Sequence, residues 1–444
     1  TRERFKALPE RERVSVLKRM GEWYLKQVEY MLAGKYFFRA GDWHGLLEAV
    51  RRDRGKSVNG EHQEEFVKWS SECPPEMLAQ DLDAVLVMMR KLFSFQQIPE
   101  MLCLRGILTE SLRQDSSMSE AERNNYLGEC ELIMSFLKYN DISAMSELHR
   151  RACSLMSRVS RSIDPQGTWT FGSPSVAMMF HRTVGMLDHE NEEMHECMPH
   201  YYKVTQGHGL GAETIMRAEA AFMQARFTDA QIALESAYAQ IDGNGQENMA
   251  LCCDFLAQRL SRYAEVGPHR SFAERRTELL RHHNASWLNL WNAAAAYHHA
   301  LLGSTDSIPE AYRRHRLFTV RTLAPGKPMI EMIENQVYLA QGEYAHVIGR
   351  SEGLLTQCEA MHYALVALHI RLQTASAYEA LGNRAMARKL LVRALEDDME
   401  FIHCAAKASP CKKCLSAAVW QKLYREINRV LDEMTLSDML KGEI

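Results

Sequence analysis

Apolar residues recur along the chain at the three- and four-residue intervals of amphipathic α-helices. Near the beginning, for example, Val14, Leu17, Met20 and Tyr24 fall on one face of a helix. Helix-forming residues dominate the composition, β-branched runs are nearly absent, and glycine and proline contribute only 24 and 12 of the 444 residues. The pattern therefore predicts an all-α protein.

The clearest unit of this pattern spans residues 378–395. An apolar-striped helix ends at Gly382, and a second helix follows in which the small residues Ala387 and Ala394 occupy positions where two helix backbones approach. A glycine between two such helices is typical of a tetratricopeptide-like hairpin.

Equivalent turns recur upstream at a nearly constant spacing of about 39 residues. The predicted turns are Gly185, Arg226, Ala264, Gly303, Gly342 and Gly382, with less regular ones at Gly41, Gln96 and Asn140. Only neighbouring hairpins can cover the apolar face of each hairpin, so such an array stacks into a superhelix. We predict a tetratricopeptide-like α-solenoid with degenerate repeats at 1–160, regular repeats at 161–395 and C-terminal capping helices at 396–444.

Two stretches break the helical pattern. Residues 162–175 contain two prolines, two glycines and two aromatic residues, and residues 203–211 are rich in glycine. Loops of this length within compact arrays are usually functional or packed across the structure. They are therefore the first places to look for a binding site.

Charge and cysteine content narrow the function classes. A net charge of -4 provides no general attraction for a nucleic-acid backbone. No apolar run approaches the roughly 20 residues that cross a bilayer, and the N-terminus lacks the apolar core of a signal peptide. Several of the 11 cysteines lie among helical apolar positions, as is typical of thiols in a reducing compartment. We expect a cytoplasmic protein with no membrane partner.

Several segments resemble blocks of a known family. Residues 167–175 (Gly-Thr-Trp-Thr-Phe-Gly-Ser-Pro-Ser), 196–203 (Glu-Cys-Met-Pro-His-Tyr-Tyr-Lys) and 207–213 (Gly-His-Gly-Leu-Gly-Ala-Glu) are similar to bacterial LuxR-type transcriptional regulators of the large, maltose-activator-like class, which belong to the STAND proteins. Shorter matches occur at 21–24, 40–43 and 135–142. The resemblance extends over residues 8–395.

The resemblance implies three modules: an N-terminal nucleotide-binding switch that uses ATP, a helical-repeat sensor, and a C-terminal helix-turn-helix. The present chain corresponds to the sensor. Gly55-Lys56-Ser57 is not a phosphate-binding loop, because Val50 stands where that motif needs a glycine. No recognition-helix signature follows residue 395. Because the chain starts without methionine inside a helical pattern, we expect further residues before Thr1.

One group of cysteines has the residue spacing of a zinc site. Cys411 and Cys414 have zinc-knuckle spacing, and His403 and Cys404 lie just upstream. A structural zinc usually needs two such pairs, and adjacent residues such as His403 and Cys404 would point in different directions from a helix. An inert or redox-labile thiol pair is therefore the favoured interpretation, and we expect no metal.

A second motif-like group surrounds His195 and His200. A zinc protease helix needs two histidines four positions apart, whereas these are five apart and Pro199 is expected to interrupt the helix. The nearby acidic residues are interpreted as a solvated helix face: Asp188, Glu190, Glu192, Glu193 and Glu196. No nucleophile motif occurs either, so we expect neither an enzyme nor a resident cofactor in this chain.

Two function classes remain open. The first is a sensor that binds a small-molecule inducer, and the second is a scaffold that holds a peptide or protein partner in a concave groove. DNA would be contacted only through the absent helix-turn-helix. Since one repeat period brings stacked segments together, we predict a sensing pocket of aromatic walls and polar contacts. The alternative is that residues 162–175, the tryptophan loop, are only a structural plug. The predicted pocket residues are Trp169, Phe171, Tyr201, Tyr202, His208 and Glu213.

Overall fold

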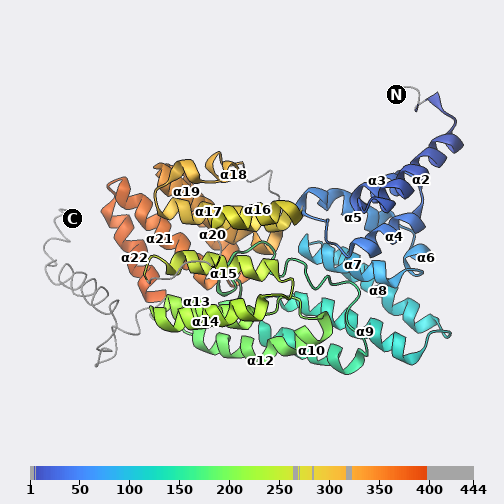
Figure 1. Cartoon of the computed structure of the whole chain (residues 1–444), viewed down its shortest axis with the longest axis horizontal. Helices are drawn as coiled ribbons and strands as arrows, with labels where there is room; N and C mark the ends of the chain where they lie inside the picture. The colour runs from blue at the N-terminus through green and yellow to red at the C-terminus, as the bar shows by residue number, and fades with distance from the viewer. Residues whose placement is uncertain are drawn as a thin grey trace, which may run out of the picture. The chain divides into compact units, whose positions relative to one another are not determined.

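The computed structural model describes residues 5, 7–263, 269, 271–282, 285–316 and 323–397. Within these residues helices are the only regular secondary structure, which confirms the predicted all-α class (Figure 1). None of the described helices is long and apolar enough to cross a membrane. Most of the predicted capping region at 396–444 lies outside the described residues.

The chain divides into two compact units. Unit 1 comprises residues 1–171, 197–210 and 320–325. Its helices are α2 (Glu10–Lys26), α3 (Tyr30–Ala40), α4 (Trp43–Asp53), α5 (Gln63–Glu72), α6 (Pro75–Leu78), α7 (Leu82–Ser94), α8 (Ile98–Gln114), α9 (Glu120–Met134) and α10 (Ile142–Leu155), with 3-10 turns at Gly60–His62 and Ser135–Lys138.

Unit 2 comprises residues 172–196, 211–319 and 326–444. Its helices are α11 (Ala177–Phe180), α13 (Ala212–Met223), α14 (Phe227–Ile241), α15 (Glu247–Leu260), α16 (Phe272–His282), α17 (Ala285–Leu301), α18 (Glu310–Arg313), α19 (Lys327–Gln341), α20 (Tyr344–Met361), α21 (Ala364–Ala380) and α22 (Arg384–Asp397). Helix α12 (Leu187–Thr205) contributes its first part to unit 2 and its last part to unit 1, and 3-10 turns occupy Thr305–Ser307 and Ala324–Gly326.

The predicted turns fall between consecutive helices wherever the structure describes them. Seven of the predicted turn residues have a positive φ, the conformation that ends a helix and reverses the chain: Gly41, Gln96, Asn140, Gly185, Gly303, Gly342 and Gly382. At the eighth, Arg226, the positive φ belongs to the preceding Ala225, and Ala264 lies outside the described residues. Ala387 and Ala394 are buried as predicted.

Short polar side chains begin several helices. The carboxylates of Asp42, Asp81 and Asp141 accept hydrogen bonds from the backbone N–H groups of Gly45, Ala84 and Ala144, at 3.1, 3.0 and 3.0 Å. These bonds satisfy N–H groups that have no partner within the helix. Each of these three aspartates lies close after a tight turn, so turn and cap together fix where the next helix starts.

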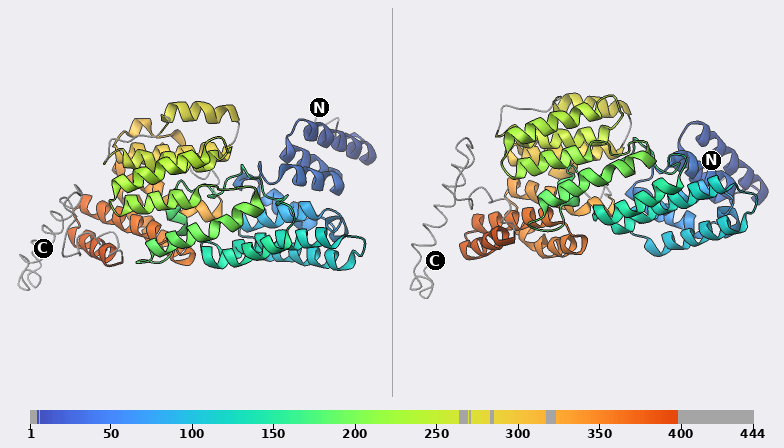
Figure 2. Two further views of the ribbon diagram at one scale, coloured as in Figure 1. Left: turned by 60° about the horizontal axis from the view of Figure 1, so that its bottom comes forward. Right: turned by 90° about the horizontal axis from the view of Figure 1, so that it is seen from below.

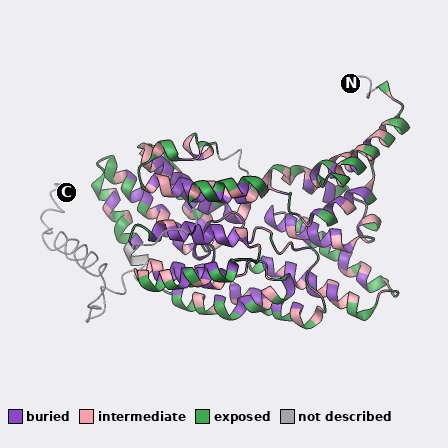
Figure 3. Ribbon diagram, viewed as in Figure 1, coloured by how far each residue is buried: buried purple, intermediate pink, exposed green. Residues whose placement is uncertain are grey.

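Successive helices pack as pairs, and most bury one face, whereas α7 and α15 are buried along nearly their whole surface (Figures 2 and 3). In unit 2 the first helices of neighbouring pairs also contact one another, in the order α13, α15, α17, α19 and α21. The short helix α11 contacts both α13 and α21. The contacts in unit 2 therefore form a closed series, with α11 joining its two ends.

The structure corrects one sequence expectation about α12. Pro199 lies inside this helix, which continues to Thr205 and so includes the first residues of the supposed irregular stretch at 203–211. A proline within a helix costs about 3 kcal/mol. The buried side chains of Cys197, Met198 and Tyr201 on either side of Pro199 supply the packing that maintains the helix.

Candidate functional site

The aperiodic stretch begins earlier than the sequence indicated. After α10 ends at Leu155, the only helix before α12 is the single turn α11. In unit 1, the Ser160 N–H donates to the carbonyl of Val204 at 2.8 Å. This bond joins the start of the aperiodic stretch to the last turn of α12.

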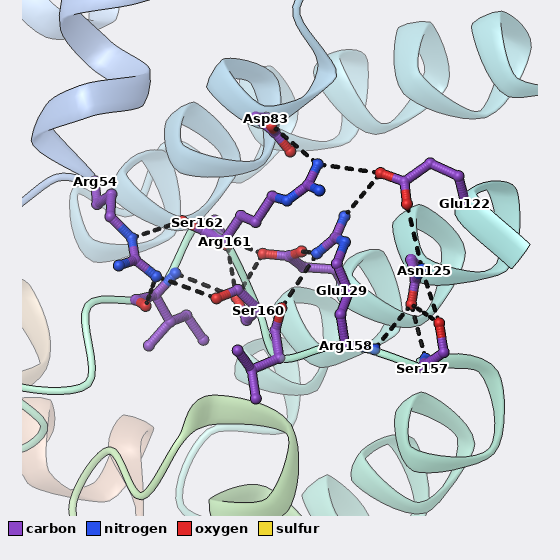
Figure 4. Close-up of polar contacts among 12 residues, drawn as sticks. Arg54, Asp83, Glu122, Asn125, Glu129, Ser157, Arg158, Ser160, Arg161 and Ser162 are labelled. Carbon is purple, nitrogen blue, oxygen red and sulfur yellow. Dashed lines mark hydrogen bonds and ion pairs between the residues drawn. The ribbon is translucent and has the colours of Figure 1, made fainter. Parts of the chain in front are cut away.

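A buried carboxylate organises the first part of this stretch (Figure 4). Glu129 of α9 is fully buried, pairs with Arg158 at 3.0 Å, and accepts a hydrogen bond from the Ser162 N–H at 2.7 Å. The Ser160 hydroxyl donates to the same carboxylate. Charge-assisted bonds of this kind impose a defined geometry when the charge is removed from water. The surrounding network also includes Asp83, Glu122, Asn125, Ser157 and Arg161.

A second cation holds the backbone of the same stretch. The Arg54 guanidinium donates to the carbonyls of Ser160, Arg161 and Ile163 at 3.1, 2.7 and 2.7 Å. Arg54 itself follows α4 in a left-handed conformation, with φ 50°. Because one guanidinium binds three carbonyl groups, it fixes the path of the backbone at residues 160–163, whatever side chains that backbone carries.

Trp169 packs against a glycine of the other predicted segment. A Cβ atom at Gly209 would lie 2.5 Å from the Trp169 ring, so only glycine allows this approach. Gly209 also has φ +77°, a conformation that favours glycine. The ring of Trp169 is thereby buried, and it contributes an apolar wall rather than an exposed platform.

Tyr201 and His208 are joined by a hydrogen bond of 2.7 Å between the phenol oxygen and Nδ1. Burial lowers the pKa of His208 to about 3, opposed by a backbone hydrogen bond with Gly167, and burial also raises the pKa of Tyr201. In the neutral imidazole, Nε2–H donates to the Gly167 carbonyl and Nδ1 accepts the phenol proton. His208 thus links the tryptophan loop to α12.

The remaining predicted residues are less enclosed or lie elsewhere. Tyr202 is half-buried and donates its hydroxyl proton to the Gly209 carbonyl at 3.1 Å. Phe171 is also half-buried, and its ring lies 6.1 Å from that of Phe93 and 5.8 Å from that of Tyr139. Glu213 belongs to unit 2, in the first turn of α13.

Two basic residues that lie beside Tyr201 or His208 were not predicted from the sequence. Arg90 of α7 acts electrostatically on Tyr201 and on His208. His149 of α10 lies with its ring 5.1 Å from that of Tyr201 and is hydrogen-bonded to Ser135 at 3.0 Å. Burial lowers the pKa of His149 to about 3, so this ring is neutral at pH 7. Both residues come from regularly patterned helices, where no local signal marks them as different from solvent-facing polar residues.

The Gly55-Lys56-Ser57 stretch has a structural explanation. The Ser57 N–H donates to Asp53 at 3.1 Å, and the buried Lys91 ammonium donates to the Val58 carbonyl at 2.8 Å. Burial, together with the neighbouring Arg90, lowers the pKa of Lys91 to about 7. These bonds hold the loop after α4 to α7.

The acidic face expected around His195 is only partly solvated. Glu190 is buried in unit 2, lies 2.7 Å from His181 Nδ1, and accepts the N–H groups of Arg182 and Thr183 at 3.1 and 3.0 Å. The interpretation of Glu190 as a solvated residue was therefore wrong, because its carboxylate accepts backbone N–H groups of the turn that lies before α12. Asp188, Glu192 and Glu196 are exposed.

No arrangement of three or more metal-ligating side chains occurs among the residues that the structure describes. The candidate ligands His403, Cys404, Cys411 and Cys414 lie outside these residues. No protein-family model matches the chain, and no curated protein is similar enough to count as a relative.

Proposed function

We propose that this chain is the ligand-sensing helical-repeat region of a LuxR-type bacterial transcriptional regulator, and that the tryptophan loop of unit 1 is its sensing element. The role is binding rather than catalysis. The turn spacing and the helix pairs also support a tetratricopeptide-like α-solenoid. ATP and DNA would be bound by the modules that the resemblance places on either side of this region, and the signal is a small-molecule inducer.

One observation carries the proposal: several polar atoms around the loop are buried without a hydrogen-bond partner in the described structure. They include Nε of Arg90, Nδ1 of His149 and Nε of Arg158. Each such atom costs about 1–3 kcal/mol. A rearrangement that exposes or pairs these atoms recovers part of that free energy, so a ligand with modest differential affinity can shift the loop between two states.

The half-buried side chains define where a ligand would reach this element. Tyr202 and Phe171 keep exposed surface, whereas Trp169, Tyr201 and His208 are enclosed. We therefore assign ligand contact to Tyr202 and Phe171, and a supporting role to the enclosed residues. Glu213 retains its role as a predicted polar contact, to be tested separately.

The protein-binding scaffold has one observation of its own in its favour. Trp23 on α2 is 54% exposed, its ring packs edge-on against Tyr24, and Tyr24 stacks on Tyr36 with ring centroids 5.3 Å apart. Exposed aromatic clusters are enriched in protein interfaces. A partner bound there would not involve the tryptophan loop.

The test uses the full-length regulator and a panel of sugars, nucleotides, amino acids and capped peptides, screened for an increase in melting temperature. A ligand at a hundred times its Kd contributes about 2.7 kcal/mol. We expect a small molecule to stabilise the protein, and Tyr202→Phe to weaken its binding and the reporter response by about tenfold. Glu213→Gln is measured in parallel as the test of that predicted contact.

Tyr378→Phe and Glu192→Gln serve as controls on a half-buried tyrosine and an exposed glutamate, and both should respond normally. Stabilisation by peptides alone, lost on Trp23→Ala and retained in Tyr202→Phe, would favour the scaffold. An unchanged response in both Tyr202→Phe and Glu213→Gln would place the sensing site elsewhere.

A further inference from the structure

Residues 173–181 lie in the interior of unit 2. Every residue of this segment is buried, from Ser173 through Met178 to His181. Its only regular structure is the single turn α11. A short segment with so little secondary structure of its own depends on its surroundings for its conformation.

Three of the surrounding helices form hydrogen bonds to the backbone of the segment. Glu219 of α13 accepts the Ala177 N–H at 2.8 Å, and the Cys252 thiol of α15 faces the Ser173 carbonyl at 3.9 Å. At the other end, the Ala364 N–H at the start of α21 donates to the His181 carbonyl at 3.1 Å. Three helices thus satisfy backbone groups at the beginning, middle and end of the segment, as a protein does for a bound peptide.

The carboxylate of Glu219, which binds the middle of the segment, is itself held in place. The second oxygen of Glu219 pairs with Arg259 at 2.9 Å, and this guanidinium lies 4.3 Å from the ring of Phe255. Glu219 is buried and both its oxygens are engaged. The acceptor for the segment is therefore preorganised by side chains that the segment does not supply.

Bonds within the segment are local. The Ser173 hydroxyl donates to the Ser175 carbonyl at 2.8 Å, and the Met178 N–H donates to the Ser175 hydroxyl at 3.1 Å. His181 is fastened to Glu190 beyond the segment's end. The apolar contribution comes from five consecutive apolar residues, Val176 to Phe180, of which methionine adapts most readily to an irregular surface.

We propose that the inner helices of unit 2 form a peptide-binding surface whose ligand is residues 173–181 of the same chain, held as an exchangeable segment rather than as a fixed part of the core. The surface recognises a short peptide with a small residue before two methionines and a phenylalanine, and binds its backbone through Glu219, Cys252 and the Ala364 N–H. This inference does not depend on the proposed sensing function, which concerns unit 1.

The experiment compares two buried methionines by hydrogen exchange of the full chain. Met178 in the segment and Met216 in α13 are both fully buried. Met178→Ala should accelerate exchange about 30-fold or more within residues 173–181, with little change in α13, α15 and α21. Met216→Ala, the matched control, should accelerate exchange across the helices of unit 2. If both variants accelerate the segment and the helices together, the segment is fixed core and the proposal is wrong.

A second measurement tests binding directly. A labelled, capped peptide with the sequence of residues 173–181 should bind Met178→Ala, whose own segment is weakly held, at least about tenfold more tightly than it binds the wild type. A scrambled peptide should bind neither protein. Failure of the peptide to bind Met178→Ala overturns the assignment of the binding surface, even when exchange in the segment is local.

Discussion

The two units secure adjacent parts of one aperiodic stretch by different means. Unit 1 holds residues 157–163 with charged side chains, chiefly Glu129 and Arg54, whereas unit 2 encloses residues 173–181 among apolar side chains and a few backbone hydrogen bonds. Buried charges require defined partners and are costly when a partner is lost. Apolar burial stabilises in proportion to area and tolerates changes in shape.

Charged anchoring and apolar enclosure suit two different tasks. The charged anchors in unit 1 specify one position of the loop and penalise intermediate positions, which is suitable for a two-state element. The apolar enclosure in unit 2 allows the segment to leave and return as a unit. Three predictions test the anchoring of the loop in unit 1, which is one side of this comparison.

The largest effect is expected from the buried carboxylate. Glu129→Gln removes the charge that compensates Arg158, and should lower the free energy of local unfolding of residues 156–163 by about 3 kcal/mol or more. Hydrogen exchange in that region measures it. Glu122→Gln alters a partly exposed member of the same network and should cost less than about 1 kcal/mol. Equal effects of the two substitutions would show that burial of the charge is not what holds the loop.

Two neighbouring glycines isolate the packing of Trp169. Gly209→Ala introduces a Cβ against the indole ring as well as backbone strain, and should cost about 2–4 kcal/mol. Gly207 has a similar φ of +80° but no atom near its missing Cβ, so Gly207→Ala should cost only about 1–2 kcal/mol. Thermal unfolding followed by tryptophan fluorescence measures the difference. If the two variants unfold alike, Trp169 does not pack as the structure shows.

Acidification should loosen unit 1 through its neutral histidines. The pKa of His149 is lowered in the folded state to about 3, so its neutral form stabilises the fold above the ordinary pKa of about 6.5, and this contribution is lost as the pH falls below that value. At pH 5 the loss is about 2 kcal/mol. His149→Gln should remove this part of the pH dependence from hydrogen exchange in α10, whereas His44→Gln, at an exposed site, should leave it unchanged. A pH profile identical in all three proteins would contradict the burial of a neutral His149.

The helical class and the turns follow from local patterns, because apolar spacing and residues that adopt positive φ act within a few positions of the chain. Gly342 and Asn140 are examples. The meeting of the tryptophan loop with the segment after α12 could also be predicted, since it follows from the repeat period.

Long-range burial could not be predicted in the same way. Nothing near Glu129 or Arg90 in the sequence distinguishes them from the many charged residues that face solvent, and their roles depend on residues far along the chain. Glu190 was assigned to the solvated face of a helix because its partner His181 lies in a turn outside the helical pattern. Pro199 was expected to end a helix because local propensity does not include the burial of Tyr201.

The bond between His181 and Ala364 also has a consequence for biosynthesis. Synthesis proceeds at about 5–20 residues per second, so residues 173–181 leave the ribosome many seconds before the start of α21 exists. During that interval the apolar run from Val176 to Phe180 lacks one side of its final enclosure. Contacts between such distant residues slow folding. Until α21 has been synthesised, the nascent chain therefore exposes part of this apolar segment. A chaperone would be needed most during this interval.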